Sequence, residues 1–380
     1  MTPLTRLSVA FDALPLAGEL TGIGRFCAGL AGALAASEAV ELKGYAVGRH
    51  ARRDTAVRAG ALGLLVRSWP VPARLANAAW SHGQWPPIEW LVGAVDVVHG
   101  TNFVVPPARR AGRVVTVYDL TALRYPELCA PASLAYPRLV KRAIASGAFV
   151  HVLTEFVRDE VVGILGARAD RVHVVPPGID AAGFADPPQS TPETERSAPY
   201  VLALGAVEPR KDLPSLVKAF ALIAPGHEEL ELVVAGPDGW GVPNFERAVA
   251  SSGVAHRVVR LGYLEEVERQ ALLRGAVALA YPSIYEGFGF PPLEAMAAGV
   301  PVVAAASGSV PEVVGDAAEL VPPGDVPALA AALERVIDDT ELRSKLTRAG
   351  RVRAACFAWG ASAASMTELY ESAAADGRGR

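Results

Sequence analysis

Short apolar runs alternate with longer amphipathic stretches along most of this chain. The runs that we predict to be buried strands are residues 7–11, 95–99, 114–118, 149–153, 172–175, 200–204, 231–235, 258–261, 277–280 and 300–304. Helical patterns lie between them, as at 213–223 and 266–273. Strands that are almost continuously apolar must be covered on both faces, which is typical of parallel sheets flanked by helices. The alternation therefore predicts an α/β fold with doubly wound, Rossmann-like sheets.

One segment near the middle of the chain has the composition of a linker. Residues 187–199 are rich in Pro, Ser, Thr and Glu and nearly free of apolar side chains. We therefore predict an N-terminal domain over 1–186, a linker over 187–199 and a second domain over 200–355. A helical segment over 356–380 ends the chain.

The composition indicates a globular protein and excludes a disordered or a fibrous one. Of 380 residues, 51% are hydrophobic and 20% are charged. Cys27, Cys129 and Cys356 are scattered without a Cys-x-x-Cys pair, so neither a disulfide nor a zinc framework is predicted. The apolar runs are strand-sized, and no signal peptide is recognisable. We therefore expect a cytoplasmic protein, either free or peripheral to the inner face of the membrane.

The charge is distributed unevenly between the two halves. Residues 1–190 hold 19 Lys and Arg against 15 Asp and Glu, a net +4, and the remainder holds 17 against 25, a net −8. A basic half could meet an anionic membrane or a phosphorylated acceptor. An excess of four is small, and an ordinary solvated surface is the preferred explanation.

Motifs of other classes of protein are missing from the sequence. It has no Asp-x-Asp, no His-x-x-x-His, no Walker A pattern and no Gly-x-Ser-x-Gly. Gly22 and Gly24 follow the first predicted strand, but Cys27 occupies the last glycine position of the dinucleotide fingerprint. Basic and aromatic residues are not interleaved as in nucleic-acid-binding proteins. We therefore expect no metal, no cofactor and no nucleic acid.

Two carboxylates eight positions apart mark the most informative segment, residues 285–294. We predict that Glu286 lies in a loop and that Glu294 lies in the first turns of a helix begun by a Pro-Pro pair. The glycines allow backbone amides to approach a ligand, and a helix N-terminus attracts anions. The segment suits a molecule with both hydroxyls and phosphates, such as a nucleotide sugar. The alternative is a plain turn with a carboxylate that favours the helix dipole.

Other polar motifs follow predicted strands, where ligands of open parallel sheets bind. In the second half, Gly205 precedes the adjacent cations Arg210 and Lys211, and Gly236 begins a tight turn. Two cations beside a helix start can hold a diphosphate.

In the first half, His99 and Asp119 each end a strand and are candidates to contact a sugar. Asp119 could accept hydrogen bonds from hydroxyls or act on a proton. The alternatives are a turn-forming Asp119 and a structural His99.

Taken in order, these motifs resemble a known family. The segments are GIGRF, LALGAVEPRKDLPSLVKAF, LVVAGPDGWG, LGYLEEVERQALLRGAVALAYPSIYEGFGFPPLEAMAAGVPVVAA and SGSVPEVVGDAAELVPPGD. The chain resembles, nearly end to end, the retaining glycosyltransferases of the GT-B fold in family 4, the glycosyl transferases group 1. VYDLTALRYPE resembles the sub-group with many mannosyltransferases. The resemblance implies two Rossmann-like domains with an interdomain cleft, and a last helix that crosses back to the N-terminal domain.

The resemblance also implies roles for individual residues of the second domain. Arg210 and Lys211 match the basic pair that neutralises the donor diphosphate. Glu294 matches the carboxylate that binds the ribose, and Glu286 matches the residue that contacts the donor sugar. The loop whose amides touch sugar hydroxyls and phosphate is matched by Gly287, Phe288, Gly289 and Phe290.

In the first domain, the resemblance covers the glycine loop, and the chain departs from the family's usual sequence at one position. Gly22 and Gly24 match the loop near the diphosphate and the acceptor. Relatives often carry His-Asp-Leu where this chain has Tyr118 and Asp119 before a leucine. Tyr118 cannot titrate near neutral pH as a histidine can, so Asp119 is the better candidate for a catalytic role.

The implied activity is transfer of a hexose, with retention, to the hydroxyl of a glycan, a lipid-linked or a small-molecule acceptor. GDP-mannose is the first choice of donor, and UDP-glucose or UDP-N-acetylglucosamine are alternatives. A sugar-phosphate epimerase or a phosphorylase of the same fold fits the carboxylate pair less well. A non-catalytic sugar-nucleotide-binding protein is the alternative of another class.

Overall fold

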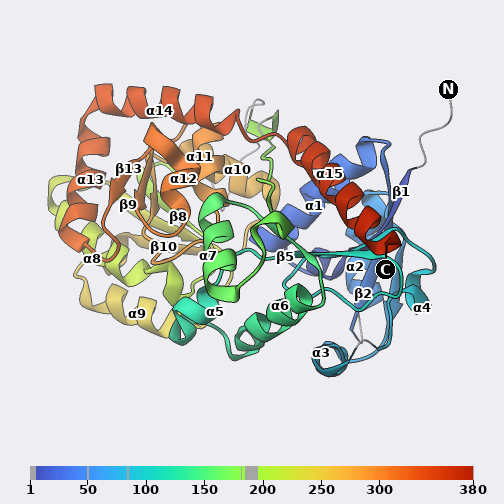
Figure 1. The fold of residues 1–380 in the computed structure, drawn as a ribbon. Coiled ribbons are helices and arrows are strands. Elements are labelled where there is room, and N and C mark those ends of the chain that lie inside the picture. The colour runs from blue at the N-terminus through green and yellow to red at the C-terminus, as the bar shows by residue number, and fades with distance from the viewer. Residues whose placement is uncertain (1–5, 49–50, 84, 181, 185–195, 380) are drawn as a thin grey trace. The chain divides into compact units, whose positions relative to one another are not determined.

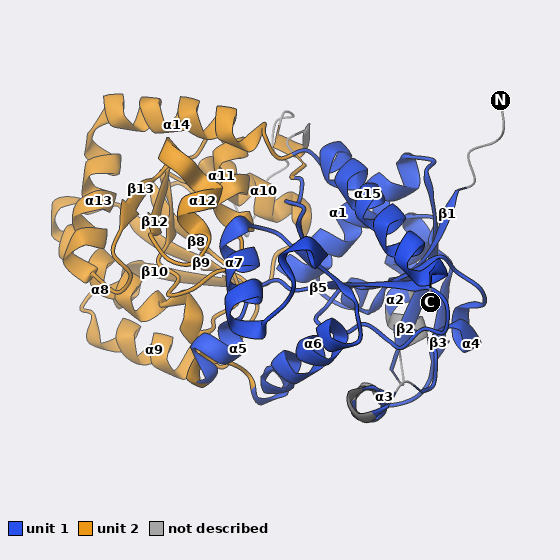
Figure 2. Ribbon diagram, viewed as in Figure 1, with its two compact units in different colours: residues 1–126, 131–178, 358–380 blue, residues 127–130, 179–357 orange. Residues whose placement is uncertain are grey.

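The structure, a computed structural model, describes residues 6–48, 51–83, 85–180, 182–184 and 196–379. The chain divides into two compact units (Figures 1 and 2). Unit 1 comprises residues 1–126, 131–178 and 358–380, and unit 2 comprises 127–130 and 179–357. Most of the predicted linker, 187–199, lies outside the described residues.

Unit 1 is built on a sheet of seven parallel strands in the order β3-β2-β1-β4-β5-β6-β7. The strands are β1 (Leu7–Asp12), β2 (Val40–Val47), β3 (Val66–Trp69), β4 (Val97–Gly100), β5 (Gly112–Thr116), β6 (Phe149–Val152) and β7 (Val172–Val174). The order runs outward in one direction from β1 and in the other from β4. The β1/β4 boundary is therefore the topological switch point of this sheet.

Unit 2 repeats this arrangement with six parallel strands in the order β10-β9-β8-β11-β12-β13. The strands are β8 (Tyr200–Leu204), β9 (Glu231–Ala235), β10 (Val258–Gly262), β11 (Ala278–Tyr281), β12 (Val302–Ala305) and β13 (Glu319–Val321). Its switch point lies between β8 and β11, and the two doubly wound sheets confirm the predicted fold class.

Helices connect the parallel strands in both units. Unit 1 contains α1 (Gly22–Ala36), α2 (Ala51–Ala61), α3 (Ala73–His82), α4 (Glu89–Val92), α5 (Thr121–Arg124), α6 (Tyr136–Ala145), α7 (Glu155–Leu165) and α15 (Trp359–Arg378). Unit 2 contains α8 (Leu213–Ile223), α9 (Val242–Ser251), α10 (Glu266–Gly275), α11 (Phe290–Ala298), α12 (Val310–Val314), α13 (Val326–Asp338) and α14 (Thr340–Ala354). Among the described helices, none has the length and apolar character needed to cross a bilayer.

The ten predicted strands correspond to β1 and to β4 through β12. The sequence pattern missed β2, β3 and β13. Charged side chains interrupt β2 and β3, at Glu41, Lys43 and Arg67, because these strands lie toward one edge of their sheet. β13 has three residues and lies at the edge of the other sheet, so it is too short to show an apolar run.

The last helix, α15, packs within unit 1 against α1 and β5 (Figure 1). Two glycines of unit 1 allow α15 to approach its neighbours closely. A Cβ on Gly29 would lie 2.1 Å from the ring of Trp359, and a Cβ on Gly112 would lie 2.1 Å from the carbonyl oxygen of Ala373. Tyr370 is fully buried in the same contact. The C-terminal segment thus completes the core of unit 1.

Candidate active site

The switch point of unit 2 brings Lys211 together with Glu286, which lies 75 positions later in the sequence. Arg210 and Lys211 lie in a single 3-10 turn, Pro209–Lys211, that follows β8. Glu286 lies in the loop between β11 and α11. Because β8 and β11 are hydrogen-bonded neighbours, their carboxyl ends meet at the same edge of the sheet. The three predicted side chains therefore converge.

These three side chains form a buried cluster of ion pairs. Lys211 Nζ lies 2.7 Å from Glu286 Oε1, and Arg210 pairs with the other oxygen of Glu286. Arg210 also donates to the carbonyl oxygen of Tyr285 at 2.9 Å. Lys211 donates to the hydroxyl of Tyr281 at 3.1 Å and lies 4.8 Å from the centre of its ring. Each cation is thus held in place by a carboxylate and by a second group.

The charges of the cluster depend on one another. Burial alone would raise the pKa of Glu286, but the nearby charges of Arg210 and Lys211 outweigh it and hold that pKa at about 2. Burial lowers the pKa of Lys211, and the charge of Glu286 opposes this effect. Glu208 lies 3.6 Å from Arg210 and adds a second carboxylate.

Two predicted glycines allow the loops of the site to approach each other. Gly205 and Gly236 have φ angles of 139° and 146°, which favour glycine. A Cβ on Gly236 would lie 2.1 Å from the carbonyl oxygen of Gly205, and a Cβ on Gly205 would lie 3.3 Å from Lys211 Cε. The glycines after β8 and β9 therefore leave room for Lys211 beside the backbone.

The predicted amide loop, residues 287–290, leads directly into α11. Gly289 precedes the helix with a φ of 145°. The ring of Phe288 is buried and meets the rings of Phe290 and Phe357 at 5.1 and 5.8 Å between centres. Phe288 thus fixes the loop by packing its ring into the interior of unit 2.

Residues 307–325 form part of the family resemblance, but the sequence did not indicate that they hold the backbone of Glu286. Ser309 donates to the carbonyl oxygen of Glu286 from its amide at 2.9 Å and from its hydroxyl at 2.8 Å. Gly308 has a φ of 55°, and a Cβ there would lie 2.2 Å from the same oxygen. The loop between β12 and α12 therefore positions the backbone of Glu286 through the amide and the hydroxyl of Ser309 and through the close approach of Gly308.

Glu294 lies in α11, as predicted, but within a separate ion pair. Its carboxylate is paired with Arg269 of α10, and both side chains are buried. Arg269 also pairs with Glu266, with 2.6 Å between Nη2 and Oε1. The sequence prediction did not include Arg269, because its burial in α10 and its pairing with α11 become visible only in the folded structure. Arg269 orients the carboxylate that was assigned to the ribose.

We expect Arg269→Met to lower the free energy of unfolding by about 3–5 kcal/mol, because Glu294 would then be a buried charge without this partner. The double variant Arg269→Met, Glu294→Met should recover most of that loss. Arg335→Met is the matched control, since it breaks the more exposed pair with Glu319 and should cost at most about 1 kcal/mol. Denaturant unfolding of the three variants measures the difference, and equal losses at Arg269 and Arg335 would contradict the assignment.

In unit 1, the predicted glycines begin α1. Gly22 is its first residue. Gly24 is buried, and a Cβ there would lie 2.7 Å from the carbonyl oxygen of Pro15 and 2.8 Å from the side chain of Leu20. The glycine at position 24 is therefore required by close packing against the segment before the helix. Gly22 is exposed at the helix start.

Tyr118 and Asp119 follow β5 and take up local structural contacts. Asp119 Oδ1 accepts a hydrogen bond from the amide of Thr121 at 2.9 Å, which is the turn-forming alternative. Tyr118 is buried, and its hydroxyl donates to the carbonyl oxygen of Thr101 at 2.6 Å. The side chain of Tyr118 thus ties β5 to the segment after β4. It does not present its hydroxyl to solvent as a sugar contact would.

His99 was predicted to contact a sugar, but its side chain is fully buried in β4. Its Nδ1 lies 2.7 Å from the hydroxyl of Tyr370, and its Nε2 lies 2.7 Å from Thr116 Oγ1. With both ring nitrogens engaged, His99 links α15 to the sheet and does not contact a ligand. This is the structural alternative for a lone histidine.

Two buried histidines make unit 1 sensitive to acid. Burial lowers the pKa of His99 well below 6.5, with a further contribution from His151, and burial lowers the pKa of His151 to about 4. A lowered folded-state pKa means that the unfolded chain binds more protons, so stability is full above pH 6.5 and is lost as pH falls toward 4. We expect the ring resonances of both histidines to stay unchanged between pH 8 and pH 6 in NMR spectra. A titration midpoint near pH 6.5 would contradict their burial.

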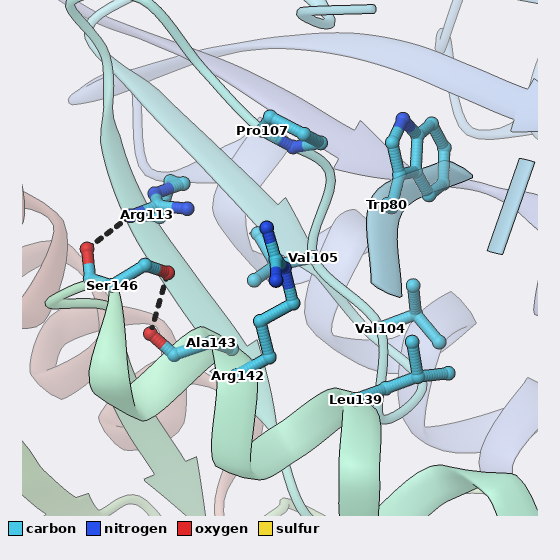
Figure 3. Close-up of a pocket in the computed structure, with 9 residues that line it drawn as sticks. All are labelled: Trp80, Val104, Val105, Pro107, Arg113, Leu139, Arg142, Ala143 and Ser146. Atoms are coloured by element: carbon cyan, nitrogen blue, oxygen red, sulfur yellow. Dashed lines mark hydrogen bonds between the residues drawn. The ribbon is translucent and has the colours of Figure 1, made fainter. Parts of the chain in front are cut away.

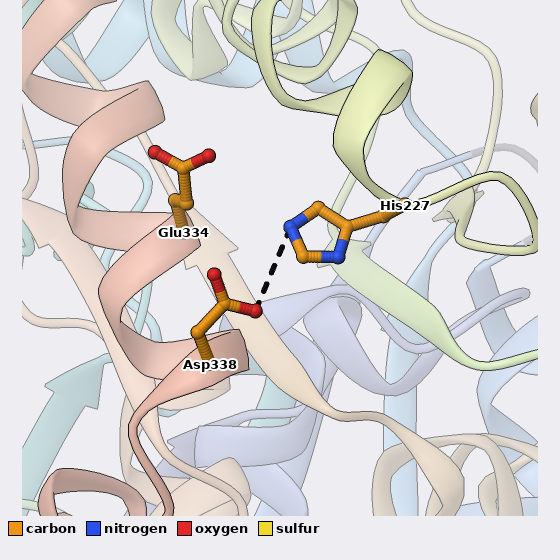
Figure 4. A group of neighbouring side chains, drawn as sticks. All are labelled: His227, Glu334 and Asp338. Carbon is orange, nitrogen blue, oxygen red and sulfur yellow. Dashed lines mark ion pairs between the residues drawn. The ribbon is translucent and has the colours of Figure 1, made fainter.

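One group of potential metal ligands occurs among the described residues. The ligand atoms of His227, Glu334 and Asp338 lie within 4.8 Å of one another (Figure 4). His227 Nε2 lies 3.7 Å from Asp338 Oδ1, and both acidic residues are exposed on α13. His227 precedes β9, at the amino ends of the strands, whereas Lys211 follows the carboxyl end of β8. The group is therefore not part of the candidate site.

A small pocket in unit 1 lies apart from the predicted residues. Its lining comes from α3, from α6 and the residue that follows it, from β5 and from the segment after β4 (Figure 3). The lining residues are Trp80, Val104, Val105, Pro107, Arg113, Leu139, Arg142, Ala143 and Ser146. Arg113 donates to the carbonyl oxygen of Ser146, so this cation is already engaged by the protein.

Family models match both parts of the chain. Residues 21–178 match a glycosyl transferase 4-like domain, and residues 189–353 match the glycosyl transferases group 1. The O-antigen chain mannosyltransferase B of Escherichia coli is 30% identical over 271 residues, which cover 69% of this chain and 71% of that protein. The chain belongs to the glycosyl transferases group 1. The candidate site lies in the part that matches the group 1 model.

A second relative and two solved structures extend this result. The MMP alpha-(1->4)-mannosyltransferase of Mycolicibacterium hassiacum is 34% identical over 239 residues, or 61% of this chain and 54% of that protein. Sucrose-phosphate synthase from Thermosynechococcus elongatus has a TM-score of 0.75 at 20% identity, covering 97% of this chain and 99% of that one. HepE from Anabaena, in complex with UDP and glucose, has a TM-score of 0.73 at 18% identity, covering 97% and 100%. These structures show that this group 1 glycosyltransferase has the GT-B fold.

Proposed function

We propose that this glycosyltransferase moves a hexose from a nucleotide diphosphate sugar to an acceptor hydroxyl. The observation that carries the proposal is the cluster of Arg210, Lys211 and Glu286 at the switch point of the second sheet. Two buried cations beside glycine loops suit a diphosphate, because an anion can take over the charge interactions that Glu286 now provides. A plain structural ion pair needs neither glycine loops nor this position.

In the proposed reaction, Arg210 and Lys211 offset the charge of the leaving diphosphate. This cationic pair would supply the stabilisation that a metal ion supplies elsewhere, so we propose a metal-independent and cofactor-free reaction. Glu286 would position the donor sugar, and Glu294 would bind the ribose hydroxyls. Retention follows if the acceptor attacks from the face that the diphosphate leaves, with a phosphate oxygen taking the acceptor proton.

GDP-mannose is the proposed donor. Support comes from the names of two relatives, the O-antigen chain mannosyltransferase B and the MMP alpha-(1->4)-mannosyltransferase. A UDP-sugar is the second candidate, since the similar HepE structures contain UDP and UDP-glucose. A glycan, a lipid-linked or a small-molecule acceptor and a cytoplasmic location, free or at the inner face of the membrane, stay predictions.

Thermal unfolding with a panel of sugar nucleotides tests the proposal. A ligand that binds only the folded state at 100 times its dissociation constant stabilises it by about 2.7 kcal/mol. We expect GDP-mannose to raise the melting temperature more than UDP-glucose, UDP-N-acetylglucosamine or ADP-glucose, without added divalent metal. If none of them changes the melting temperature, the donor proposal is wrong. A response to UDP-sugars alone would transfer the assignment to the second candidate.

A further inference from the structure

Lys211 has a partner that carries no charge. Tyr281 is the last residue of β11, the strand that pairs with β8 at the switch point of unit 2, and it is buried. Lys211 Nζ donates a hydrogen bond to the Tyr281 hydroxyl over 3.1 Å and lies 4.8 Å from the centre of the ring. Buried tyrosine hydroxyls usually find a polar partner. Here that partner is one of the two cations of the candidate site.

The direction of this hydrogen bond follows from the chemistry of the two groups. An ammonium group donates and cannot accept, so the oxygen of Tyr281 is the acceptor. Burial raises the pKa of Tyr281 well above 10, and the charge of Glu286 raises it further. Burial also lowers the pKa of Lys211. The hydroxyl of Tyr281 therefore stays protonated and neutral wherever Lys211 is charged.

Glu286 and Tyr281 act on the Lys211 ammonium in different ways. Glu286 holds the nitrogen at 2.7 Å and also neutralises its charge. Tyr281 holds the same nitrogen without adding a negative charge. A diphosphate that replaced Glu286 as the anionic partner would leave the hydrogen bond to Tyr281 intact, because an ammonium has three N–H donors. Tyr281 can therefore keep Lys211 in position while its anionic partner changes.

The stem of Lys211 is confined as well as its end. A Cβ on Gly205 would lie 3.3 Å from Lys211 Cε, so the backbone after β8 lies close to the stem. The side chain of Lys211 is only 14% exposed. Fixing a long lysine side chain costs conformational entropy, and a cation that is already fixed does not incur this cost when a ligand binds. The contact with Tyr281 completes this preorganisation at the ammonium.

We infer that Tyr281 is a positioning residue for the donor diphosphate, and that it acts by holding the ammonium of Lys211 where the diphosphate binds. The identity of the anion rests on the proposed function, whereas the hold on Lys211 rests on the 3.1 Å contact. Loss of the hydroxyl should leave the charge of Lys211 in place but let the ammonium move, because a phenylalanine ring has no hydroxyl acceptor. The effect should therefore appear in the binding of a nucleoside diphosphate more than in that of a monophosphate.

Tyr281→Phe, which removes the hydroxyl and keeps the ring, tests the inference in the full chain. We expect its affinity for GDP, measured by calorimetric titration, to fall about threefold to tenfold, the usual range for the loss of one hydrogen bond. Its affinity for GMP should stay that of the wild type. In the Lys211→Met background, Tyr281→Phe should cause no further loss of GDP affinity, because no ammonium is left to hold.

Tyr200→Phe is the matched control. Tyr200 is the first residue of β8, at the opposite end of that strand from Lys211, and it is as buried as Tyr281. Its hydroxyl donates to the carbonyl oxygen of Leu272 at 2.6 Å. The control thus removes a buried hydroxyl and its hydrogen bond from the same unit, and it should bind GDP as the wild type does.

NMR titration of the Lys211 ammonium in the free protein separates this inference from the proposed function. Loss of an acceptor disfavours the charged form, so the pKa of Lys211 should fall in Tyr281→Phe and stay unchanged in Tyr200→Phe. The charged groups that face this ammonium, Glu286, Arg210 and Glu208, are the same in the wild type and in both variants.

The inference holds if Tyr281→Phe lowers both the pKa of Lys211 and the affinity for GDP, and if Tyr200→Phe lowers neither. It is overturned if the pKa of Lys211 is unchanged, if GDP binds as tightly as to the wild type, or if GMP affinity falls as much as GDP affinity. Additive losses in the double variant with Lys211→Met would also overturn it. If the wild type binds no GDP while Tyr281→Phe still lowers the pKa of Lys211, the proposed function is wrong and the hold of Tyr281 on Lys211 stands.

Discussion

Glu286→Gln is expected to lower kcat by about 10²–10³-fold, the usual effect of removing one group that stabilises developing charge. Nucleotide binding should be kept or should tighten, because Arg210 and Lys211 then lose the carboxylate that competes with the diphosphate. Steady-state transfer assays and calorimetric titration with GDP measure the two quantities separately. Glu229→Gln, an exposed carboxylate of unit 2, is the matched control.

A loss of turnover together with an equal loss of GDP affinity would contradict this role for Glu286. A wild type that binds sugar nucleotides but never transfers or hydrolyses them would instead support the non-catalytic alternative.

The free energy of unfolding provides a second readout of the Glu286→Gln variant. Because the pKa of Glu286 is lowered from 4.5 to about 2, its contribution to stability is full above pH 4.5 and is lost as pH falls toward 2. The stability difference between wild type and Glu286→Gln should shrink in that window.

Lys211→Met is expected to weaken GDP binding by about tenfold to a hundredfold, since a charge-assisted hydrogen bond contributes about 1.5–3 kcal/mol. Arg210→Met should have an effect at least as large, because its guanidinium can hold two phosphate oxygens at once. Calorimetric titration with GDP and with GMP measures the effect. The loss should be smaller for GMP, which lacks the second phosphate.

Lys345→Met, which removes an exposed lysine from α14, is the control for the loss of one positive charge. If Lys211→Met and Lys345→Met bind GDP equally well, the cluster has no role in diphosphate binding. Glu286→Gln combined with Lys211→Met should be more stable than Lys211→Met alone, because the double variant leaves no excess of negative charge. Measuring this difference in stability would also show, independently of ligand binding, that both variants are folded.

The fold and the residues of the Arg210, Lys211 and Glu286 cluster could be predicted because their signals are local. Apolar runs marked the central strands, and positions just after β8 and β11 identified Arg210, Lys211 and Glu286. The three side chains lie together because β8 and β11 both adjoin the switch point of one sheet. The edge strands were missed because solvent-facing charges interrupt β2 and β3 and because β13 is short.

The rest of the site depends on contacts between distant segments. The pairing of Arg269 with Glu294 and the hydrogen bonds from Ser309 to Glu286 join different loops and helices, so no periodicity reveals them. His99 was predicted as a contact because it ends a strand, yet α15 covers it with Tyr370, 271 residues later in the chain. Burial by such a remote segment is visible only in the folded structure.

A crystal structure with GDP-mannose bound tests the central claim most directly. The account predicts diphosphate oxygens at about 2.7–3.2 Å from the side-chain nitrogens of Arg210 and Lys211, and ribose hydroxyls on Glu294. A diphosphate bound elsewhere, or held by a metal ion while Arg210 and Lys211 keep their pairs with Glu286, would contradict it.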